Sequence, residues 1–314
     1  METSSREKVV ITAALTGALT TRKQCQYIPY TPVEIAEEAK RCADAGAAVV
    51  HIHAREDDGM PSFKVEKYRQ IMDEIRKRSD IIINFSTGAV GIPMEHRVGH
   101  IARLKPEIGA LNMGSMNYAI YSEKKKAFYF DFVFANPFKD ISYLLERMNE
   151  GGVKPELECF DNGHIANTRP LLDQGILQPP LDFSLVMGVL GGIPSTPRAL
   201  QFQAESLPPG STWKLVGISR DQWPLLAQTL TLGGNLRVGL EDNFYFPDGE
   251  MAKGSSYLVE RAVRMSTDVG RTVATVAEAR EALGLSPVPR LVPSDYVPDQ
   301  DEVAFTPDFS ALSS

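Results

Sequence analysis

Short apolar stretches alternate along the chain with longer amphipathic stretches. The apolar stretches are rich in Val, Ile and Leu and have the length of single buried strands. In the segments between them, apolar side chains recur every three or four residues, which is the period of a helix. Strands are predicted at residues 8–14, 48–53, 81–86, 108–113, 156–160, 182–187, 212–217 and 235–240. Helices are predicted at residues 32–45, 65–78, 94–104, 140–150, 165–174, 198–205, 222–232, 255–269 and 275–283.

About eight strand-then-helix units follow one another, and this repetition indicates a parallel sheet with helical crossovers. Such units close most economically into a (β/α)8 TIM barrel, so we predict an α/β fold with one catalytic domain over residues 1–285. A doubly wound open sheet is the alternative, but no G-x-G-x-x-G motif follows the first strand. Residues 128–134 are aromatic and alternating, and we interpret them as an extended excursion. Residues 286–314 form a Pro/Asp-rich tail, expected to wrap a surface or a neighbouring subunit, or to be partly disordered.

The composition narrows the class of protein. Of 314 residues, 43% are hydrophobic and 23% are charged, which is typical of a soluble globular protein. A formal net charge of −7 argues against nonspecific binding to nucleic acid. The three cysteines are widely spaced and the N-terminus has no apolar signal region, so a cytoplasmic location is predicted. No apolar run reaches about 18 residues, so no membrane span is predicted.

Two histidines end the second predicted strand. His51 and His53 are separated by one residue, and side chains two apart in a strand point to the same face. One metal ion could therefore bind both imidazoles, with a third ligand supplied from elsewhere in the chain. For an isolated H-x-H pair, the simpler interpretation is two hydrogen-bonded histidines without a metal.

The other strand ends carry polar side chains, which a (β/α)8 barrel collects at one face. These residues are Ser86, Thr87, Asn112, Glu158, Arg237, Glu241, Asp242 and Asn243. Because the last strand of a closed barrel returns beside the first, Glu241 is expected to complete a Zn²⁺ site with His51 and His53. Fe²⁺ or Mn²⁺ would accept the same ligands. Asp242 is then free to act as a base held by a bidentate pair with Arg237, and a surface ion pair is the alternative.

The remaining histidines and one glycine-rich loop give weaker signals. His164 follows the fifth strand, and we interpret it as a surface residue rather than a further metal ligand. His96 and His100 are four residues apart and are interpreted as belonging to a helix surface. The loop at residues 188–192 is either a plain turn or a place where backbone N–H groups bind a phosphate or a pantetheine arm.

Five segments together resemble the β-keto acid cleavage enzyme family. They are residues 11–18 (ITAALTGA), 51–59 (HIHAREDDG), 86–88 (STG), 111–114 (LNMG) and 237–243 (RVGLEDN). The H-x-H-x-R and R-x-G-x-E-D-N signatures are specific in combination, and the resemblance extends over residues 9–285.

The resemblance implies a zinc-dependent acyltransferase, in which a β-keto acid and acetyl-CoA give acetoacetate and a new acyl-CoA. It implies that His51, His53 and Glu241 bind the zinc. It also implies that Asp242 removes the C2 proton of the substrate and that Arg237 assists. A homo-oligomer is expected, and the family suggests a tetramer.

The same resemblance points to residues that contact the substrate. We expect them to be Ser86, Thr87, Gly88 and Asn112, with Ser86 at the carboxylate or thioester. Members that act on an amine-bearing substrate have an acidic residue where this chain has Leu19, and a hydroxyl-bearing residue is expected where it has Ala110. These departures predict a substrate whose distal end is neutral or apolar.

Two alternatives compete with this interpretation. A metal-dependent hydrolase is the first, because such barrels also use an H-x-H pair. Those enzymes carry the pair on the first strand and need further His or Lys ligands, whereas this chain has five histidines and its pair on the second strand. The second alternative is a barrel that serves as a binding scaffold and holds no metal.

Overall fold

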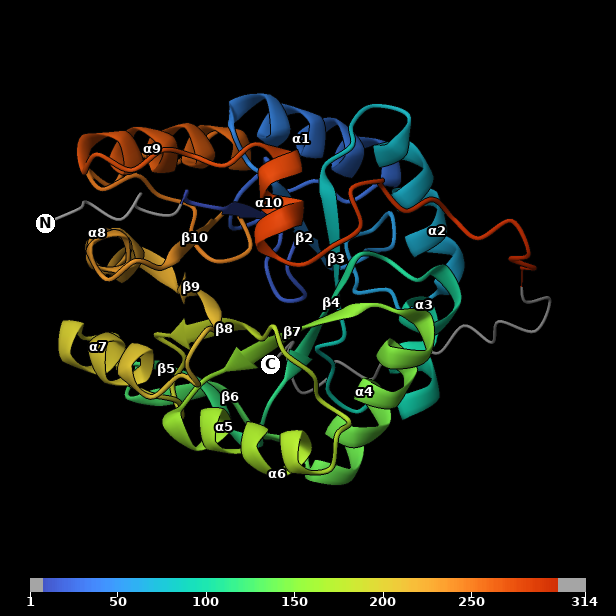
Figure 1. The fold of residues 1–314 in the computed structure, drawn as a ribbon. Coiled ribbons are helices and arrows are strands. Elements are labelled where there is room, and N and C mark those ends of the chain that lie inside the picture. Colours follow the sequence, from blue (N-terminus) through green and yellow to red (C-terminus); the bar gives the residue numbers. More distant parts are fainter. Residues whose placement is uncertain (1–7, 299–314) are drawn as a thin grey trace, which may run out of the picture.

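Eight parallel strands form a closed barrel in the computed structural model, which describes residues 8–298 (Figure 1). The strands follow the order β1-β10-β9-β8-β7-β4-β3-β2 around the barrel. They are β1 (Ile11–Ala14), β2 (Val49–Ile52), β3 (Ile82–Ser86), β4 (Ile108–Asn112), β7 (Lys154–Cys159), β8 (Asp182–Met187), β9 (Thr212–Gly217) and β10 (Asn235–Val238). The predicted (β/α)8 barrel is confirmed, and the pairing of β1 with β10 excludes an open sheet.

Helices form a ring outside the barrel (Figure 1). They are α1 (Pro32–Ala45), α2 (Val65–Arg76), α3 (Met94–Leu104), α4 (Phe138–Gly151), α5 (Asn162–Ala166), α6 (Thr168–Asp173), α7 (Pro197–Glu205), α8 (Gln222–Thr231), α9 (Ser255–Asp268) and α10 (Val276–Ala282), with a 3-10 turn at Ser219–Asp221. The single helix predicted at residues 165–174 is wrong, since α5 and α6 replace it. The break follows from Pro170, which has no N–H to donate to the carbonyl of Ala166.

The interior of the barrel changes character from one end to the other. Near the amino ends of the strands, Val10, Val49, Ile82 and Ile108 pack in one apolar cluster with Leu283, which follows α10. The barrel strands also bury polar and charged side chains: Thr12, His51, Asn84, Ser86, Asn112, Glu156, Glu158, Asp182, Ser184, Lys214 and Arg237. The apolar end is closed by α10, and the polar end faces the βα loops, where barrels of this kind place their sites.

A β-hairpin lies between β4 and α4. Its strands, β5 (Met116–Ser122) and β6 (Ala127–Phe134), pair antiparallel. The segment predicted as an extended excursion is therefore the second strand of this hairpin, and its partner β5 was not predicted. The hairpin packs against the carboxyl ends of β7, β8 and β9 through an apolar cluster built on Phe134, Phe160, Val186 and Val216. It thus lies at the same end of the barrel as the polar interior.

The chain continues after α10 without regular secondary structure as far as residue 298. The backbone N–H of Arg290 donates to Glu107 Oε1 at 3.1 Å, and its guanidinium donates to the carbonyl oxygens of Lys105 at 3.2 Å and Gly151 at 3.0 Å. These contacts bind the described part of the tail to the ends of α3 and α4. The rest of the predicted tail, residues 299–314, lies outside the described residues.

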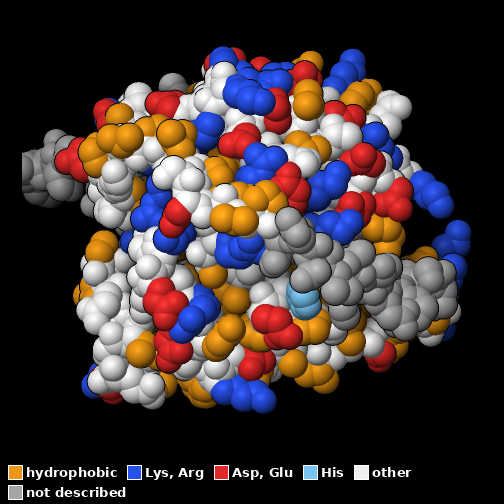
Figure 2. Space-filling view, turned by 90° about the vertical axis from the view of Figure 1, so that its right-hand side faces the viewer, with side chains coloured by type: hydrophobic (Ala, Val, Ile, Leu, Met, Phe, Trp, Pro, Cys, Tyr) orange, Lys and Arg blue, Asp and Glu red, His pale blue; other side chains and the backbone are white. Residues whose placement is uncertain are grey.

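Charged side chains of both signs are interspersed on the face shown in Figure 2. On the helices, some exposed charges pair one helical turn apart, as Lys40 of α1 does with Asp44. Such exposed pairs each contribute little to stability. Among residues 8–298, no helix combines the length and the apolar character needed to cross a membrane.

Candidate active site

Three side chains converge at the polar end of the barrel. Nε2 of His51 lies 3.5 Å from Oε1 of Glu241, and Nε2 of His53 lies 3.4 Å from the same oxygen. One potential ligand atom of each residue lies within 4.8 Å of those of the other two. The imidazole rings meet edge to face at 70°, so they approach the carboxylate rather than stack on each other. Two imidazoles and a carboxylate in this arrangement can hold a divalent cation.

Barrel closure and two local contacts position these three side chains. β1 pairs with both β2 and β10, which brings the ends of the second and last barrel strands together. The backbone N–H of His53 donates to Thr16 Oγ1 at 2.9 Å, and the Thr16 hydroxyl donates to the His53 carbonyl at 2.7 Å. Gly17 donates its N–H to Glu241 Oε2 at 3.1 Å. Gly17 has φ +62°, and a Cβ there would lie 2.9 Å from Cγ of Glu241, so glycine is required.

Arg237 holds the two adjacent carboxylates of the loop after β10. Its Nε donates to Asp242 Oδ2 at 2.8 Å, and its Nη2 donates to Asp242 Oδ1 at 3.0 Å and to Glu241 Oε1 at 2.7 Å. Its Nη1 lies 3.5 Å from Oε1 of Glu158. The contact with Asp242 has the bidentate geometry predicted from the sequence. Both partners are buried, so it is not a surface ion pair.

The pKa values of neighbouring carboxyl groups are shifted in opposite directions. Burial opposes ionisation of Glu241, but His51 and Arg237 outweigh it and lower its pKa well below the usual range. Burial raises the pKa of Asp242 against the opposing charge of Arg237, and Glu241 raises it further. Burial also raises the pKa of Glu158. Glu241 is therefore suited to bind a cation as an anion, and Asp242 is the more basic group.

A second group of charges lies deeper in the barrel. Lys214 Nζ lies 2.9 Å from Oε2 of Glu156 and 2.8 Å from Oδ2 of Asp182, and Asn84 Nδ2 donates to Glu156 Oε2 at 2.9 Å. Burial alone would raise the pKa of Glu156, but Lys214 lowers it to about 2. Sequence analysis missed Glu156, Asp182 and Lys214. The available signal was a charged residue inside an otherwise apolar buried strand, which needs a buried partner.

Several buried polar atoms of the interior have no hydrogen-bond partner among residues 8–298. They are Thr12 Oγ1, His51 Nδ1, Asn84 Oδ1, Asn112 Nδ2, Glu156 Oε1 and Ser184 Oγ. Native structures pair the great majority of their buried polar atoms. This concentration of unpaired atoms around the histidines marks an interior suited to binding further polar groups.

Three of the predicted substrate-contacting residues lie beside the histidines. Ser86 Oγ accepts a hydrogen bond from the N–H of Gly88 at 3.1 Å. A Cβ on Gly88 would lie 3.3 Å from Ser86 Oγ, 3.6 Å from Asn112 Nδ2 and 3.8 Å from Cε1 of His53. Gly88 therefore leaves space between Ser86, Asn112 and His53, and a Cβ there would press on Ser86 Oγ while making ordinary contact with the other two.

The other predicted contacts lie in different surroundings. Thr87 is fully buried, and its hydroxyl donates to the Ala110 carbonyl at 2.5 Å. Ala110 is fully buried on β4 between its partners Ser86 and Glu156. Leu19 is 37% exposed on the loop after β1, two residues beyond Gly17. An apolar side chain thus lies on the loop that contacts Glu241.

The surface interpretation of two histidines is wrong. His164 is buried, and its Nδ1 accepts a hydrogen bond from the N–H of Phe160 at 3.2 Å. His100 is fully buried and stacks on Tyr68 with ring centroids 3.8 Å apart, while its Nε2 donates to the Ser86 carbonyl at 2.9 Å. Burial lowers the pKa of His100 to about 3. Helical spacing placed His100 on a face of α3, but it could not show that this face packs against the barrel.

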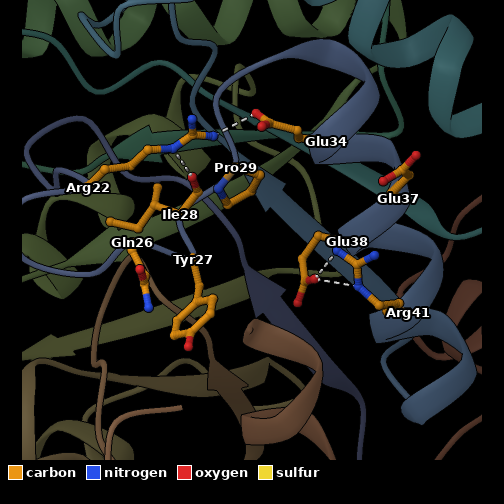
Figure 3. A pocket seen from close by; sticks show the side chains of 9 residues that line it. All are labelled: Arg22, Gln26, Tyr27, Ile28, Pro29, Glu34, Glu37, Glu38 and Arg41. Atoms are coloured by element: carbon orange, nitrogen blue, oxygen red, sulfur yellow. Dashed lines mark hydrogen bonds and ion pairs between the residues drawn. The ribbon is translucent and has the colours of Figure 1, made fainter. Parts of the chain in front are cut away.

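A separate hollow of about 270 Å³ lies beside α1 (Figure 3). Both of its arginines are already paired with glutamates: Arg22 with Glu34 at 2.7 Å, and Arg41 with Glu38 at 2.7 Å. Within residues 8–298, none of the buried polar atoms that lack a hydrogen-bond partner belongs to a residue lining this hollow, in contrast to the barrel interior.

A closed (β/α)8 barrel with His, His and Glu side chains converging at its carboxyl end has the architecture typical of metal-dependent barrel enzymes. The family model described as beta-keto acid cleavage enzyme matches residues 8–285. The chain belongs to this family. It is accordingly an enzyme, an acyltransferase of the β-keto acid cleaving class.

Relatives of known activity are similar along nearly their whole length. The 3-keto-5-aminohexanoate cleavage enzyme of Acetoanaerobium sticklandii is 42% identical over 282 residues, covering 89% of this chain and 99% of that protein. The 3,5-dioxohexanoate:acetyl-CoA acetone transferase of Paraburkholderia graminis is 34% identical over 301 residues, covering 90% of this chain and 97% of that protein. The structure of ObcA with oxaloacetate aligns with a TM-score of 0.67 at 23% identity over 83% of this chain and 68% of that chain, which shows a shared fold.

Proposed function

We propose that this enzyme condenses a β-keto acid with acetyl-CoA to give acetoacetate and a new acyl-CoA, with a divalent metal, zinc, bound by His51, His53 and Glu241. The convergence of these three ligand atoms within 4.8 Å is the observation that carries the proposal. Acetyl-CoA as co-substrate is supported by the names of the relatives, several of which are acetyl-CoA-dependent transferases.

The charges of the site fit a bound cation. The ionic contacts of the interior join five carboxylates to two cations, Arg237 and Lys214. The carboxylates are Glu156, Glu158, Asp182, Glu241 and Asp242. The excess of negative charge is costly in a buried site unless a cation offsets it. The imidazole nitrogens of His51 and His53 and the carboxylate of Glu241 are ligands that Zn²⁺ prefers. These three residues are called the triad below.

A bound zinc ion would supply Lewis-acid polarisation of the substrate's keto and carboxylate oxygens. Asp242 is proposed to take the C2 proton of the β-keto acid, because its pKa is raised and Arg237 fixes its orientation. The resulting C2 carbanion attacks the acetyl thioester and releases the CoA thiolate. The thiolate then adds to the original keto carbon, and cleavage of the C2–C3 bond releases acetoacetate, whose C2 recovers the proton from Asp242.

Three residues that lie beside His53, namely Ser86, Gly88 and Asn112, are proposed to contact the substrate. Ser86 and Asn112 are polar, buried and close to His53 across Gly88, which suits them to the carboxylate or thioester oxygen. The Asn112 Nδ2 atom is a buried donor with no hydrogen-bond partner among residues 8–298. Thr87 is proposed to support this wall through its bond to Ala110 rather than by a free hydroxyl.

The distal end of the substrate is proposed to be neutral or apolar. Leu19 and Ala110 offer neither a charge nor a hydrogen bond to an ammonium group. Burying an unpaired ammonium would cost several kcal/mol, whereas an alkyl chain gains about 0.8 kcal/mol per buried CH₂. The catalytic domain is proposed to span residues 1–285, with residues 286–314 as a separate tail, and the enzyme is proposed to act as a homo-oligomer in the cytoplasm.

A substrate screen tests the proposal. The purified enzyme is incubated with acetyl-CoA and a series of aliphatic β-keto acids, and acetoacetate and the new acyl-CoA are quantified together with bound metal. We expect both products in equal amounts and one metal ion per chain. Release of acetate and free CoA without acetoacetate would instead indicate hydrolysis and contradict the proposal.

A further inference from the structure

The β5–β6 hairpin has two different faces. On one face, Tyr118 stacks with Phe132 at a centroid distance of 5.3 Å and an interplanar angle of 6°, and it also meets Phe134 and Phe160 edge to face. On the other face, the alternate residues Asp131 and Val133 of β6 are exposed, and Phe128 and Tyr129 near the turn are exposed as well. The aromatic side chains of the first face thus form a wall that continues into the carboxyl end of β7.

The hairpin is fixed in place by the loop after β8. Ala119 and Leu190 form an isolated antiparallel bridge. Gly191 has φ +107°, and a Cβ there would lie 2.0 Å from the Asn117 carbonyl oxygen, so only glycine allows this approach. The hairpin therefore packs directly on the glycine-rich loop at residues 188–192. The loop contacts the hairpin through Leu190 and Gly191.

The inner wall of the hairpin reaches the candidate active site. Tyr118 and Ile218 pack against the same apolar cluster, and the next residue, Ser219, donates its N–H to the Asp242 carbonyl at 2.8 Å. Burial raises the pKa of the Tyr118 phenol to about 12, and the nearby carboxylates of Glu241, Asp242 and Glu158 add to the shift. The phenol is therefore protonated at neutral pH. Its hydroxyl makes no hydrogen bond to any of residues 8–298.

We infer that the hairpin covers the active site and that Tyr118 contacts the substrate. The Tyr118 ring forms the apolar wall for the acyl part of the β-keto acid, and the Tyr118 hydroxyl donates a hydrogen bond to a substrate oxygen. The inference rests on the proposed function and adds a specificity-determining residue to it. The inference accounts for two features: the large aromatic surface of the hairpin, and a Tyr118 hydroxyl that has no hydrogen-bond partner among residues 8–298.

Binding measurements test the substrate contact. Dissociation constants of acetoacetate and 3-oxohexanoate are measured by calorimetry on metal-loaded protein without acetyl-CoA. The two added methylenes should tighten binding to the wild type by about fourfold each. Tyr118→Ala should lose most of this gain. Tyr118→Phe should keep the gain and weaken both ligands by about three- to tenfold, the usual effect of one lost hydrogen bond.

Tyr129 provides the matched control, because it lies on the same hairpin and is 45% exposed. Tyr129→Ala should leave both dissociation constants unchanged. Retention of the chain-length gain in Tyr118→Ala, or an equal loss in both alanine variants, would overturn the substrate contact. If the wild type binds neither acid, the proposed function fails and the contact with it.

A spectroscopic measurement tests, without any substrate, whether the hairpin lies over the active site. Tyr118→Trp and Tyr129→Trp variants are titrated with Co²⁺, and the fluorescence of wild-type protein, which contains Trp213 and Trp223, is subtracted. Quenching by Co²⁺ in the triad falls steeply with distance, so the Tyr118→Trp signal should be quenched more strongly. Equal quenching in the two variants would overturn the placement of the hairpin over the site, whatever the substrate.

Discussion

Two buried ionic clusters lie at opposite ends of the barrel and are built differently. At the amino ends of the strands, Glu107 accepts hydrogen bonds from Arg76 at 2.7 and 2.9 Å and from Arg280 at 2.9 Å. The backbone N–H groups of Ile83 and Arg290 donate to the same carboxylate at 3.2 and 3.1 Å. Both oxygens of this one carboxylate accept hydrogen bonds, and the two guanidinium groups outnumber it.

At the carboxyl ends of the strands, carboxylates outnumber the basic group that they contact. Arg237 is shared by three carboxylates, Glu158, Glu241 and Asp242, and neighbouring atoms such as His51 Nδ1 have no hydrogen-bond partner among the described residues. A buried carboxylate whose oxygens already accept all the hydrogen bonds they can stabilises the fold, because it has no capacity left to bind a ligand. A cluster with excess negative charge, and with atoms that lack partners among residues 8–298, is suited to binding a further group, and this difference distinguishes a structural buried carboxylate from a candidate functional one.

The largest expected effect comes from removing a histidine of the proposed metal site. His51→Ala should lose bound metal and turnover together, because two of three protein ligands hold a zinc ion poorly. Metal analysis after desalting and acetoacetate formation are the measurements. His96→Ala on α3 is the control and should keep both. Full zinc occupancy in His51→Ala would exclude this residue as a ligand.

Removing the proposed base should separate metal binding from chemistry. Asp242→Asn should keep the metal and reduce kcat by about 10²–10⁴-fold, the usual contribution of a general base. Exchange of the substrate's C2 protons into D₂O, followed by NMR, reports the same step without acetyl-CoA. Wild-type exchange rates in this variant would rule out Asp242 as the base.

Breaking the saturated cluster should affect stability rather than activity. Glu107→Gln leaves the guanidinium groups of Arg76 and Arg280 buried without their anion, and should lower the free energy of unfolding by about 3–5 kcal/mol. The folded fraction should keep its metal and its kcat. Asp44→Asn, which breaks the exposed pair with Lys40 on α1, is the control and should cost less than about 1 kcal/mol. A large loss of metal in Glu107→Gln would mean that the two clusters are coupled.

The smallest expected effect concerns the distal end of the substrate. The wild type should favour an aliphatic β-keto acid over its 5-amino analogue by at least about tenfold in kcat/KM, which requires about 1.4 kcal/mol. Leu19→Glu should reduce this ratio, because it offers a partner for the ammonium group. Val33→Glu, an exposed position on α1, is the control. Equal or better turnover of the amino compound by the wild type would show that Leu19 does not set specificity.

Much of this enzyme is determined by local sequence. Alternation of apolar strands and amphipathic helices predicted the barrel, since each unit can bury its apolar face only against its neighbours. The two-residue period of a strand placed His51 and His53 side by side, and the spacing from Arg237 to Asp242 suited a bidentate pair. These features depend on backbone geometry over a few residues.

Other features depend on contacts between distant parts of the chain, which only the tertiary structure decides. Lys214 meets Glu156 and Asp182 across three barrel strands, and His100 is buried because of what packs on its helix face. The position of Tyr118 likewise depends on a hairpin that docks on a loop far along the chain. The sequence marks such residues as polar or aromatic, but the free energy that fixes their partners arises from barrel closure and packing, which no local pattern encodes.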